Sequence, residues 1–332
     1  MRVEFPSLFD LQVNGFGGVD FNNPSTTGGD VLRAVNRMRT TGVTRFLATL
    51  ITSPFERFAA CAQTLVGTNL RAMVGIHMEG PYIAAEDGPR GAHPREHVVQ
   101  ASIDDFVRRQ EAAGGNIRLV TLAPEVPGAM ILIEYLVSRG VRVAIGHTAA
   151  TSEQIRDAIQ AGATLSTHLG NGCESQLARH PNLIWEQLAA DELSASLIVD
   201  GHHLPAATIK AMVRAKTPQR TILITDATAA AGCGPGRYEF NGETVVLSES
   251  GRVSQVGRPW LAGSAITLDQ AVANMVKFAG LPLEQVWPMA SNNPAQYLGL
   301  RTAGKVVADW NAAACQLTKL KVFESDPHGK NP

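Results

Sequence analysis

Short apolar runs rich in β-branched residues alternate with longer amphipathic stretches along most of the chain. The apolar runs have the length and composition of strands that are buried on both faces, and the amphipathic stretches have the length of helices. The predicted strands are 8–13, 44–50, 72–77, 118–122, 142–145, 164–167, 195–199 and 221–225. The predicted helices between them include 31–39, 56–65, 103–112, 129–138, 153–160 and 206–214.

This alternation predicts a (β/α)8 TIM barrel, because parallel strands that are each followed by a helix can close into a cylinder. An open doubly wound sheet is the alternative. That fold would need a phosphate-binding GxGxxG or GxxxxGK[ST] motif, and neither follows a predicted strand. The barrel is therefore the expected fold.

The last third of the chain departs from the alternation. Two strand-like runs flank Asn241-Gly242, a dipeptide typical of β-hairpins, so residues 237–256 are predicted to form a hairpin insertion. Residues 264–279 and 291–300 are predicted to be helical. We therefore assign 1–304 to the barrel, 305–323 to a remnant β segment and 324–332 to a disordered tail.

Polar side chains stand where the predicted strands end. In a barrel the carboxyl ends of all strands meet at one mouth, so residues that are far apart in sequence converge there. The residues in these positions are Gln12, Asn14, Glu79, His147, His168, Asp200 and Asp226. Each position alone is a weak signal, but their joint placement predicts an active site at the mouth.

Glu79, His147 and His168 offer one carboxylate and two imidazoles, which suit zinc or another first-row divalent ion. Three protein ligands leave a coordination position for a water molecule, whose pKa the ion lowers. The alternative is a set of hydrogen-bonded side chains at strand ends, and for any one histidine this is the more common role. The shared position of all three favours a single metal site.

Asp226 follows a buried apolar run, where it could take a proton from a metal-bound water and pass it to a leaving amine; its alternative role is to cap the next segment. His93 lies in a glycine-flanked loop, either as a group that polarises a carbonyl or as an exposed side chain without a role.

His202 and His203 are adjacent, so their side chains point apart and at most one of them faces the barrel mouth. Arg179, in a polar loop, either binds a phosphate or carboxylate or is simply solvated.

The composition narrows the function classes. The chain has 332 residues, 45% of them hydrophobic, and its 29 Lys+Arg against 30 Asp+Glu give a net charge of -1. Without a basic block, a nucleic-acid partner is not expected, although a local phosphate site is compatible with the charge. The chain lacks a bilayer-length apolar run and signal-peptide features, and its four separated cysteines predict reduced thiols. We expect a cytoplasmic protein that does not bind membranes.

The motifs together resemble those of the N-acetylglucosamine-6-phosphate deacetylases of the amidohydrolase superfamily. The resemblance rests on DLQVNG, GVDF, HMEGPYI followed by GAH, GHT, THLGN, DGHH, LITDA and LAGSAITL, which occur in unchanged order from about residue 7 to about residue 300. It implies a metal-dependent TIM barrel that removes acetate from an amino sugar phosphate.

The resemblance implies a role for each motif residue. The metal ligands it implies are Glu79, His147 and His168. Asp226 corresponds to the catalytic base and acid, and His93 to the residue that assists carbonyl polarisation. The implied substrate-binding residues are Asn171, Gly172, Arg179, His203, Gln12 and Asn14, with the arginine contributed across the interface of a homodimer.

Gln12 and Asn14 stand where many amidohydrolases carry His-x-His, which holds another metal. Amides are weaker ligands, so the resemblance implies one tightly bound ion: zinc is expected, with iron, manganese or cobalt as alternatives. The sequence differs from the family pattern at Gly170, Gly172 and Cys173, where relatives usually carry bulkier residues.

The small β-sandwich of the family normally takes strands from both termini. Here the sequence begins close to the first barrel strand, so this domain is expected to be reduced or absent, with no N-terminal share and with 305–323 as a remnant. Two other functions stay open at this point. One is a deacetylase or amidohydrolase for another N-acetyl amino sugar or amide, and the other is an inactive sugar-phosphate-binding protein.

Overall fold

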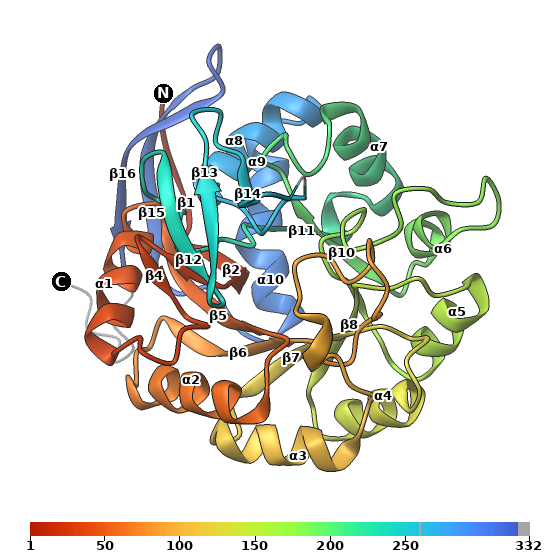
Figure 1. The fold of residues 1–332 in the computed structure, drawn as a ribbon. Helices are drawn as coiled ribbons and strands as arrows, with labels where there is room; N and C mark the ends of the chain where they lie inside the picture. Colours follow the sequence, from red (N-terminus) through yellow and green to blue (C-terminus); the bar gives the residue numbers. More distant parts are fainter. Residues whose placement is uncertain (259, 325–332) are drawn as a thin grey trace.

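In the computed structural model, which describes residues 1–258 and 260–324, eight parallel strands curl into a nearly closed barrel (Figure 1). Neighbours in the barrel follow the order of the chain. The strands are β2 (Leu8–Val13), β5 (Val43–Ile51), β6 (Met73–Glu79), β7 (Ile117–Leu122), β8 (Arg142–Ile145), β9 (Leu165–Ser166), β10 (Ser194–Ile198) and β11 (Thr221–Ile224). The predicted TIM barrel is confirmed, and each strand lies within two residues of its predicted limits.

Most of the helices surround the strands on the outside of the barrel, whereas α10 (Asn292–Tyr297) lies within the ring and packs on the barrel interior (Figure 1). The helices are α1 (Gly28–Arg39), α2 (Phe55–Gly67), α3 (Ile103–Ala112), α4 (Ala129–Ser138), α5 (Ser152–Gln160), α6 (Leu183–Ala189), α7 (Ala206–Lys216), α8 (Leu268–Ala279), α9 (Leu283–Val286) and α10 (Asn292–Tyr297). Short 3-10 turns are η1 (Arg95–His97), η2 (Pro218–Arg220) and η3 (Trp287–Ala290). Within the described part of the chain, each helix is too short or too polar to cross a lipid bilayer.

Several helices differ from the sequence prediction: α9 was not predicted, and α10 ends at Tyr297, three residues before the predicted end. The helix expected to begin at residue 264 begins at Leu268, because Thr267 forms a capping box with Gln270 and so fixes the first turn. Helix α6 was not predicted. It begins after Asn182, whose side chain accepts hydrogen bonds from two backbone N–H groups of its first turn.

The interior of the barrel is filled with apolar side chains. Residues from seven strands form one cluster with Ala295 of α10, namely Phe9, Leu11, Leu47, Leu119, Ala144, Leu165, Ile198, Ile222 and Ile224. Tyr297, Leu298 and Leu300 pack against the same cluster. Since side chains occupy the interior, ligands have access only at an end of the barrel, as is usual for this fold.

A buried carboxyl group links the first barrel strand, β2, to the end of the last one, β11. Asp10 on β2 accepts hydrogen bonds from the Thr225 hydroxyl at 2.6 Å and from the Thr225 backbone N–H at 3.3 Å. A single parallel bridge joins Val13 to Ala227 just beyond this point. Burial raises the pKa of Asp10 from 3.8 to about 7, against the effect of the Thr225 and Gln12 hydrogen bonds.

This raised pKa predicts a pH-dependent difference between the protein and Asp10→Asn. Between pH 4 and pH 7 the unfolded chain has released the Asp10 proton while the folded chain retains it, so the wild type loses stability as pH rises. The variant lacks this titration. The free energy of unfolding of the variant minus that of wild type is therefore expected to increase by about 2–3 kcal/mol from pH 5 to pH 8. Urea unfolding at both pH values measures this, and a pH-independent difference would contradict it.

A small antiparallel sheet lies beside the barrel and joins the two ends of the described chain (Figure 1). Its strands are β1 (Arg2–Pro6), β15 (Lys305–Asn311) and β16 (Gln316–Phe323), in the order β1-β15-β16. The expectation that the N-terminus contributes nothing to the tail segment is wrong. The short run before Ser7 pairs along its whole length with β15. This pairing is reinforced by the stacking of Phe5 on Trp287, at a ring-centroid distance of 4.7 Å.

Of the predicted tail 324–332, the structure describes Glu324. Glu324 forms an ion pair with Arg39 at an N–O distance of 3.0 Å. Residues 325–332 lie outside the described residues. A further two-stranded ribbon, β3 (Gly15–Phe16) and β4 (Val19–Asp20), follows β2.

The segment predicted to hold a hairpin forms three antiparallel strands: β12 (Gly236–Phe240), β13 (Glu243–Leu247) and β14 (Val253–Gln255). Asn241 and Gly242 turn the chain with φ angles of 53° and 85°, which these two residue types tolerate best. The buried carboxylate of Asp20 accepts a hydrogen bond from the Asn241 backbone at 2.7 Å. The turn is thus fastened to the barrel, and the insertion packs on Ile51 at the end of β5.

Candidate active site

A cavity of about 230 Å³ opens where several barrel strands end. The predicted site residues that line it are Asn14, Glu79, His93, His147, His168, Asn171, Gly172, His203 and Asp226. Gln12 is not part of this wall but donates hydrogen bonds to two of its members. Arg179 is exposed on the loop before α6 and does not line the cavity of this chain.

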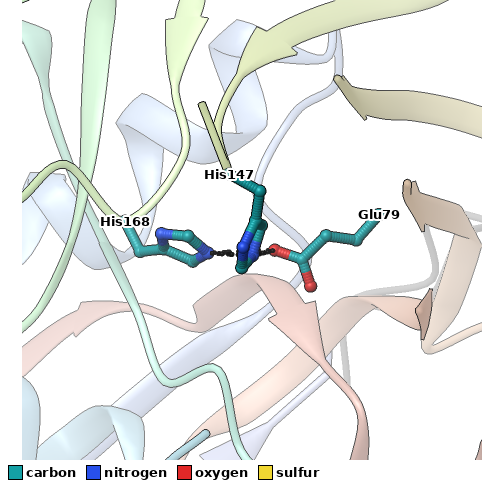
Figure 2. A group of neighbouring side chains, drawn as sticks. All are labelled: Glu79, His147 and His168. Carbon is teal, nitrogen blue, oxygen red and sulfur yellow. Dashed lines mark hydrogen bonds and ion pairs between the residues drawn. The ribbon is translucent and has the colours of Figure 1, made fainter. Parts of the chain in front are cut away.

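Glu79, His147 and His168 converge on one point (Figure 2). Glu79 is the last residue of β6, and each histidine stands two residues beyond its strand, β8 or β9. Glu79 Oε1 lies 3.0 Å from His168 Nε2 and 3.3 Å from His147 Nε2, and the two Nε2 atoms are 3.1 Å apart. All three side chains are buried. Three residues that are remote in sequence therefore share one small volume.

The arrangement of these atoms suits a divalent cation. His147 Nδ1 donates a hydrogen bond to the Pro89 carbonyl at 2.9 Å, so the Nε2 atom of a neutral His147 directs a lone pair at Glu79 and His168. Facing acceptor atoms repel one another unless a proton or a cation lies between them. Ligand atoms at about 2.0–2.1 Å from a tetrahedral ion are about 3.3 Å apart, close to the separations found here. These residues could hold one metal ion.

The electrostatics of the trio show that the Glu79 carboxylate depends on a positive partner. Burial opposes the ionisation of Glu79, but hydrogen bonds and charges from His147 and His168 outweigh it and hold the pKa of the carboxyl well below its usual range. Burial also lowers the pKa of His168, but its contacts with Glu79 outweigh this and raise the pKa overall. A carboxylate that stays ionised in the interior needs a positive partner; a protonated His168 supplies it here, and a bound metal ion would take its place on neutral imidazoles.

Three site residues have a strained backbone. His147, His168 and Asp226 have φ angles of 51°, 30° and 50°, in a region that non-glycine residues rarely adopt. Each costs about 1–3 kcal/mol and persists only where the surrounding structure enforces it. All three residues line the cavity, so the strained positions coincide with the site.

Asp226 lies next to the trio and is held by two amides. Gln12 Nε2 donates to Asp226 Oδ1 at 3.0 Å and to Glu79 Oε1 at 2.8 Å, and Asn14 Nδ2 donates to the same Asp226 oxygen at 2.7 Å. Within the described residues, Asp226 Oδ2 receives no hydrogen bond. Burial, reinforced by the Glu79 charge, raises the pKa of Asp226 to about 6. One oxygen is thus fixed, and the other is available to exchange a proton.

His93 also lines the cavity. Its Nε2 atom is 3.9 Å from Glu79 Oε2, and its ring centroid lies 4.2 Å from that of His147. The loop that carries it is closed by Arg90, which donates to the His93 carbonyl at 2.5 Å. Burial, together with the charge of His147, lowers the pKa of His93 well below its usual range. The ring is therefore neutral, and it can donate from only one nitrogen.

His203, not His202, faces the cavity. Asp200 Oδ2 accepts a hydrogen bond from His203 Nδ1 at 2.7 Å, and Asp200 Oδ1 accepts from both histidine backbone N–H groups at 2.8 Å. Because Nδ1 bonds Asp200, the other ring nitrogen of His203, Nε2, stays available for a ligand in the cavity. The sequence placed Asp200 at the end of a strand but assigned it no role; its contacts orient a histidine of the cavity wall.

An apolar rim of the cavity was missed by the sequence reasoning. Phe240, Trp260 and Leu261 line the cavity from the hairpin insertion and from the segment that follows it. Trp260 is 49% exposed although it is a large aromatic side chain. The predicted hairpin after the last barrel strand was the only available signal, because loops at this end of a barrel commonly shape its site.

The chain matches no protein-family model. It is 34% identical over 315 residues to the N-acetylglucosamine-6-phosphate deacetylase of Lysinibacillus sphaericus, covering 93% of this chain and 80% of that protein. It is 34% identical over 327 residues to the human enzyme of the same name, covering 94% and 78%. An N-acetylgalactosamine-6-phosphate deacetylase of Escherichia coli O157:H7 is 35% identical over 301 residues, covering 89% and 78%.

Solved structures agree with these relatives. A mutant N-acetyl-D-glucosamine-6-phosphate deacetylase of Mycobacterium smegmatis, in complex with N-acetyl-D-glucosamine-6-phosphate, superposes with a TM-score of 0.89 at 31% identity, covering 97% of this chain and 86% of that one. The enzyme of Thermotoga maritima superposes with a TM-score of 0.85 at 26% identity, covering 97% and 89%. By fold, coverage and identity, the chain belongs to the N-acetylglucosamine-6-phosphate deacetylase family of amidohydrolases.

Proposed function

We propose that this protein hydrolyses the acetamide of N-acetylglucosamine 6-phosphate to acetate and glucosamine 6-phosphate. The observation that carries the proposal is the convergence of Glu79, His147 and His168 beside Asp226 in one cavity. Family membership supplies the reaction class, cleavage of an amide C–N bond, and the relatives supply the substrate. The intact trio and the neighbouring carboxylate argue against an inactive sugar-phosphate-binding protein.

We propose that Glu79, His147 and His168 hold one divalent ion, and that the ion is zinc. Two imidazoles and one carboxylate are a common zinc ligand set, and three protein ligands leave room for water. A bound ion would supply a lowered pKa for that water and polarisation of the amide carbonyl. Gln12 and Asn14 turn their N–H groups toward carboxylates, which makes a second ion on these two amides unfavourable.

Asp226 is the proton carrier in this proposal. Its Oδ1 atom is held by Gln12 and Asn14, so Oδ2 takes a proton from the attacking water. The same atom then gives the proton to the amine nitrogen as the C–N bond breaks. His93 donates a hydrogen bond from Nε2 to the carbonyl oxygen as negative charge develops there.

The remaining predicted residues bind the sugar phosphate. Asn171, Gly172 and His203 line the same cavity, and His203 is held by Asp200 with Nε2 available for a phosphate or hydroxyl oxygen. Arg179 is exposed and outside the cavity of its own chain, so a phosphate contact from this residue requires a second subunit. The homodimer therefore stays a prediction.

N-acetylgalactosamine 6-phosphate is the second candidate substrate. The E. coli O157:H7 relative named for that sugar is 35% identical to this chain, as similar as the relatives named for the glucosamine derivative. The two sugars carry the same acetamide and the same phosphate, so the metal site cannot distinguish them. The choice depends on contacts with the sugar ring.

Acetate release from purified, zinc-loaded protein tests the substrate. We expect kcat/KM for N-acetylglucosamine 6-phosphate to exceed that for unphosphorylated N-acetylglucosamine by about 100-fold, because charge-assisted hydrogen bonds to the phosphate are lost. A higher kcat/KM for the galactosamine derivative would identify the second candidate. Equal values with and without phosphate would contradict a phosphate site, and no acetate from any of the three sugars would contradict the proposed reaction.

A further inference from the structure

Thr52 has a buried hydroxyl group that the proposed reaction leaves without a role. The residue follows directly after β5 and is fully buried. Its Oγ1 atom lies 2.8 Å from His93 Nδ1. Within the described part of the chain, this is the one hydrogen bond of the Thr52 hydroxyl and also the one partner of that ring nitrogen. The contact therefore determines which atom of the pair carries a hydrogen.

The strand-to-loop turn of β6 leaves space for this hydroxyl. Gly80 follows Glu79 with a φ angle of 75°, a conformation that favours glycine. A Cβ atom at Gly80 would lie 2.2 Å from Thr52 Oγ1, so a side chain at this position would displace the hydroxyl. The glycine that follows Glu79 therefore leaves the space in which the Thr52 hydroxyl contacts His93.

The direction of the hydrogen bond follows from the available partners. If His93 Nδ1 donated to Thr52, the hydroxyl hydrogen would be buried without an acceptor, which costs about 1–3 kcal/mol. If the hydroxyl donates to Nδ1, its hydrogen has an acceptor, and the ring hydrogen is on Nε2, which faces the negative Glu79 carboxylate with Oε2 at 3.9 Å. The second arrangement is the more stable one.

We propose that Thr52 is a positioning residue: its hydroxyl donates to His93 Nδ1 and fixes the ring as the Nε2–H tautomer. This deepens the proposed function and depends on it for the role of His93, since only the Nε2–H tautomer can donate to a carbonyl oxygen in the cavity. The tautomer assignment itself does not depend on any activity.

Three substitutions separate the hydroxyl from the bulk of the side chain. Thr52→Val keeps the shape without the hydroxyl, Thr52→Ser keeps the hydroxyl, and Thr52→Ala removes the hydroxyl without added bulk should the valine variant fold poorly. We expect kcat to fall about 10–100-fold in the valine and alanine variants, with KM changed less than about threefold, and to stay within about threefold of wild type in the serine variant. Zinc content and the thermal transition serve as checks on folding.

Nitrogen NMR of protein with 15N-labelled imidazoles reads the tautomer directly, with His93→Gln identifying the signals. We expect wild type and Thr52→Ser to show His93 with protonated Nε2 and bare Nδ1, and Thr52→Val to show a mixture of tautomers. An unchanged His93 tautomer in the valine variant, or a serine variant as impaired as the valine variant, would overturn the proposal. If the wild type shows no deacetylase activity, the proposed function fails while the NMR result still decides the tautomer.

Discussion

Replacing Asp226 with Asn is expected to lower kcat by about three orders of magnitude or more, while the zinc content stays at one equivalent per chain. An amide keeps an oxygen where Gln12 and Asn14 donate, so the side chain can hold its position. It cannot take a proton from water or give one to the amine. Acetate-release kinetics and elemental analysis of the same preparation measure both effects.

A matched control is available on the surface. Asp191 pairs with Arg220 at 2.8 Å and its side chain is 79% exposed, so Asp191→Asn removes a surface carboxylate that does not line the cavity. This control is expected to keep the wild-type rate. Residual turnover above about one tenth of wild type in Asp226→Asn would remove Asp226 from its assigned role.

Replacing Glu79 with Gln is expected to abolish both zinc retention and turnover. A neutral amide is a much weaker ligand than a carboxylate, and the two imidazoles alone leave the ion without a negative partner. The apparent stability should fall as well, because an ion that binds only the folded state stabilises it by mass action. Elemental analysis after dialysis, acetate release and the thermal transition with and without added zinc measure these effects.

His77 provides the control for this experiment. It lies two residues before Glu79 on β6 and is buried, but its Nε2 atom is 2.7 Å from Thr121 Oγ1 instead of joining the trio. His77→Gln is therefore expected to retain one equivalent of zinc. A Glu79→Gln protein that still holds zinc after dialysis would contradict the ligand assignment, as would loss of zinc from His77→Gln alone.

The sequence predicted the barrel and the meeting of its site residues for one reason. Parallel strands in βα units share an edge, so the position of a residue relative to the end of its strand decides whether it reaches the mouth. Glu79, His147, His168 and Asp226 all follow this rule. Their convergence is a property of the fold and needed no knowledge of side-chain detail.

Orientation within the site could not be predicted in the same way. The left-handed backbone at His147, His168 and Asp226 arises from tertiary contacts, such as the hydrogen bond between the His168 N–H and Ser196 Oγ at 2.8 Å. The sequence showed Gln12 as an amide at a strand end, but its hydrogen-bond directions depend on where two carboxylates lie. Side-chain geometry at the site is set by neighbours that are distant in sequence.

Other features could not be predicted from the sequence because the residues that form them are few and lie far apart in the chain. Strand β1 has only five residues, and its partner β15 lies about 300 residues later in the chain. No local sequence pattern therefore predicts that the two strands pair. Trp260 reaches the cavity rim from a loop with no periodicity. The contact between Thr52 and His93 joins a strand end to a loop 41 residues later and depends on the absence of a side chain at Gly80.

Anomalous X-ray diffraction from zinc-loaded crystals, with data collected on both sides of the zinc absorption edge, shows whether Glu79, His147 and His168 bind one ion. We expect one strong peak in the cavity, about 2.0–2.2 Å from a Glu79 carboxylate oxygen and from the Nε2 atoms of His147 and His168. A cavity without a peak in zinc-loaded protein, or a peak bound by other side chains while this trio stays hydrogen-bonded to itself, would contradict it.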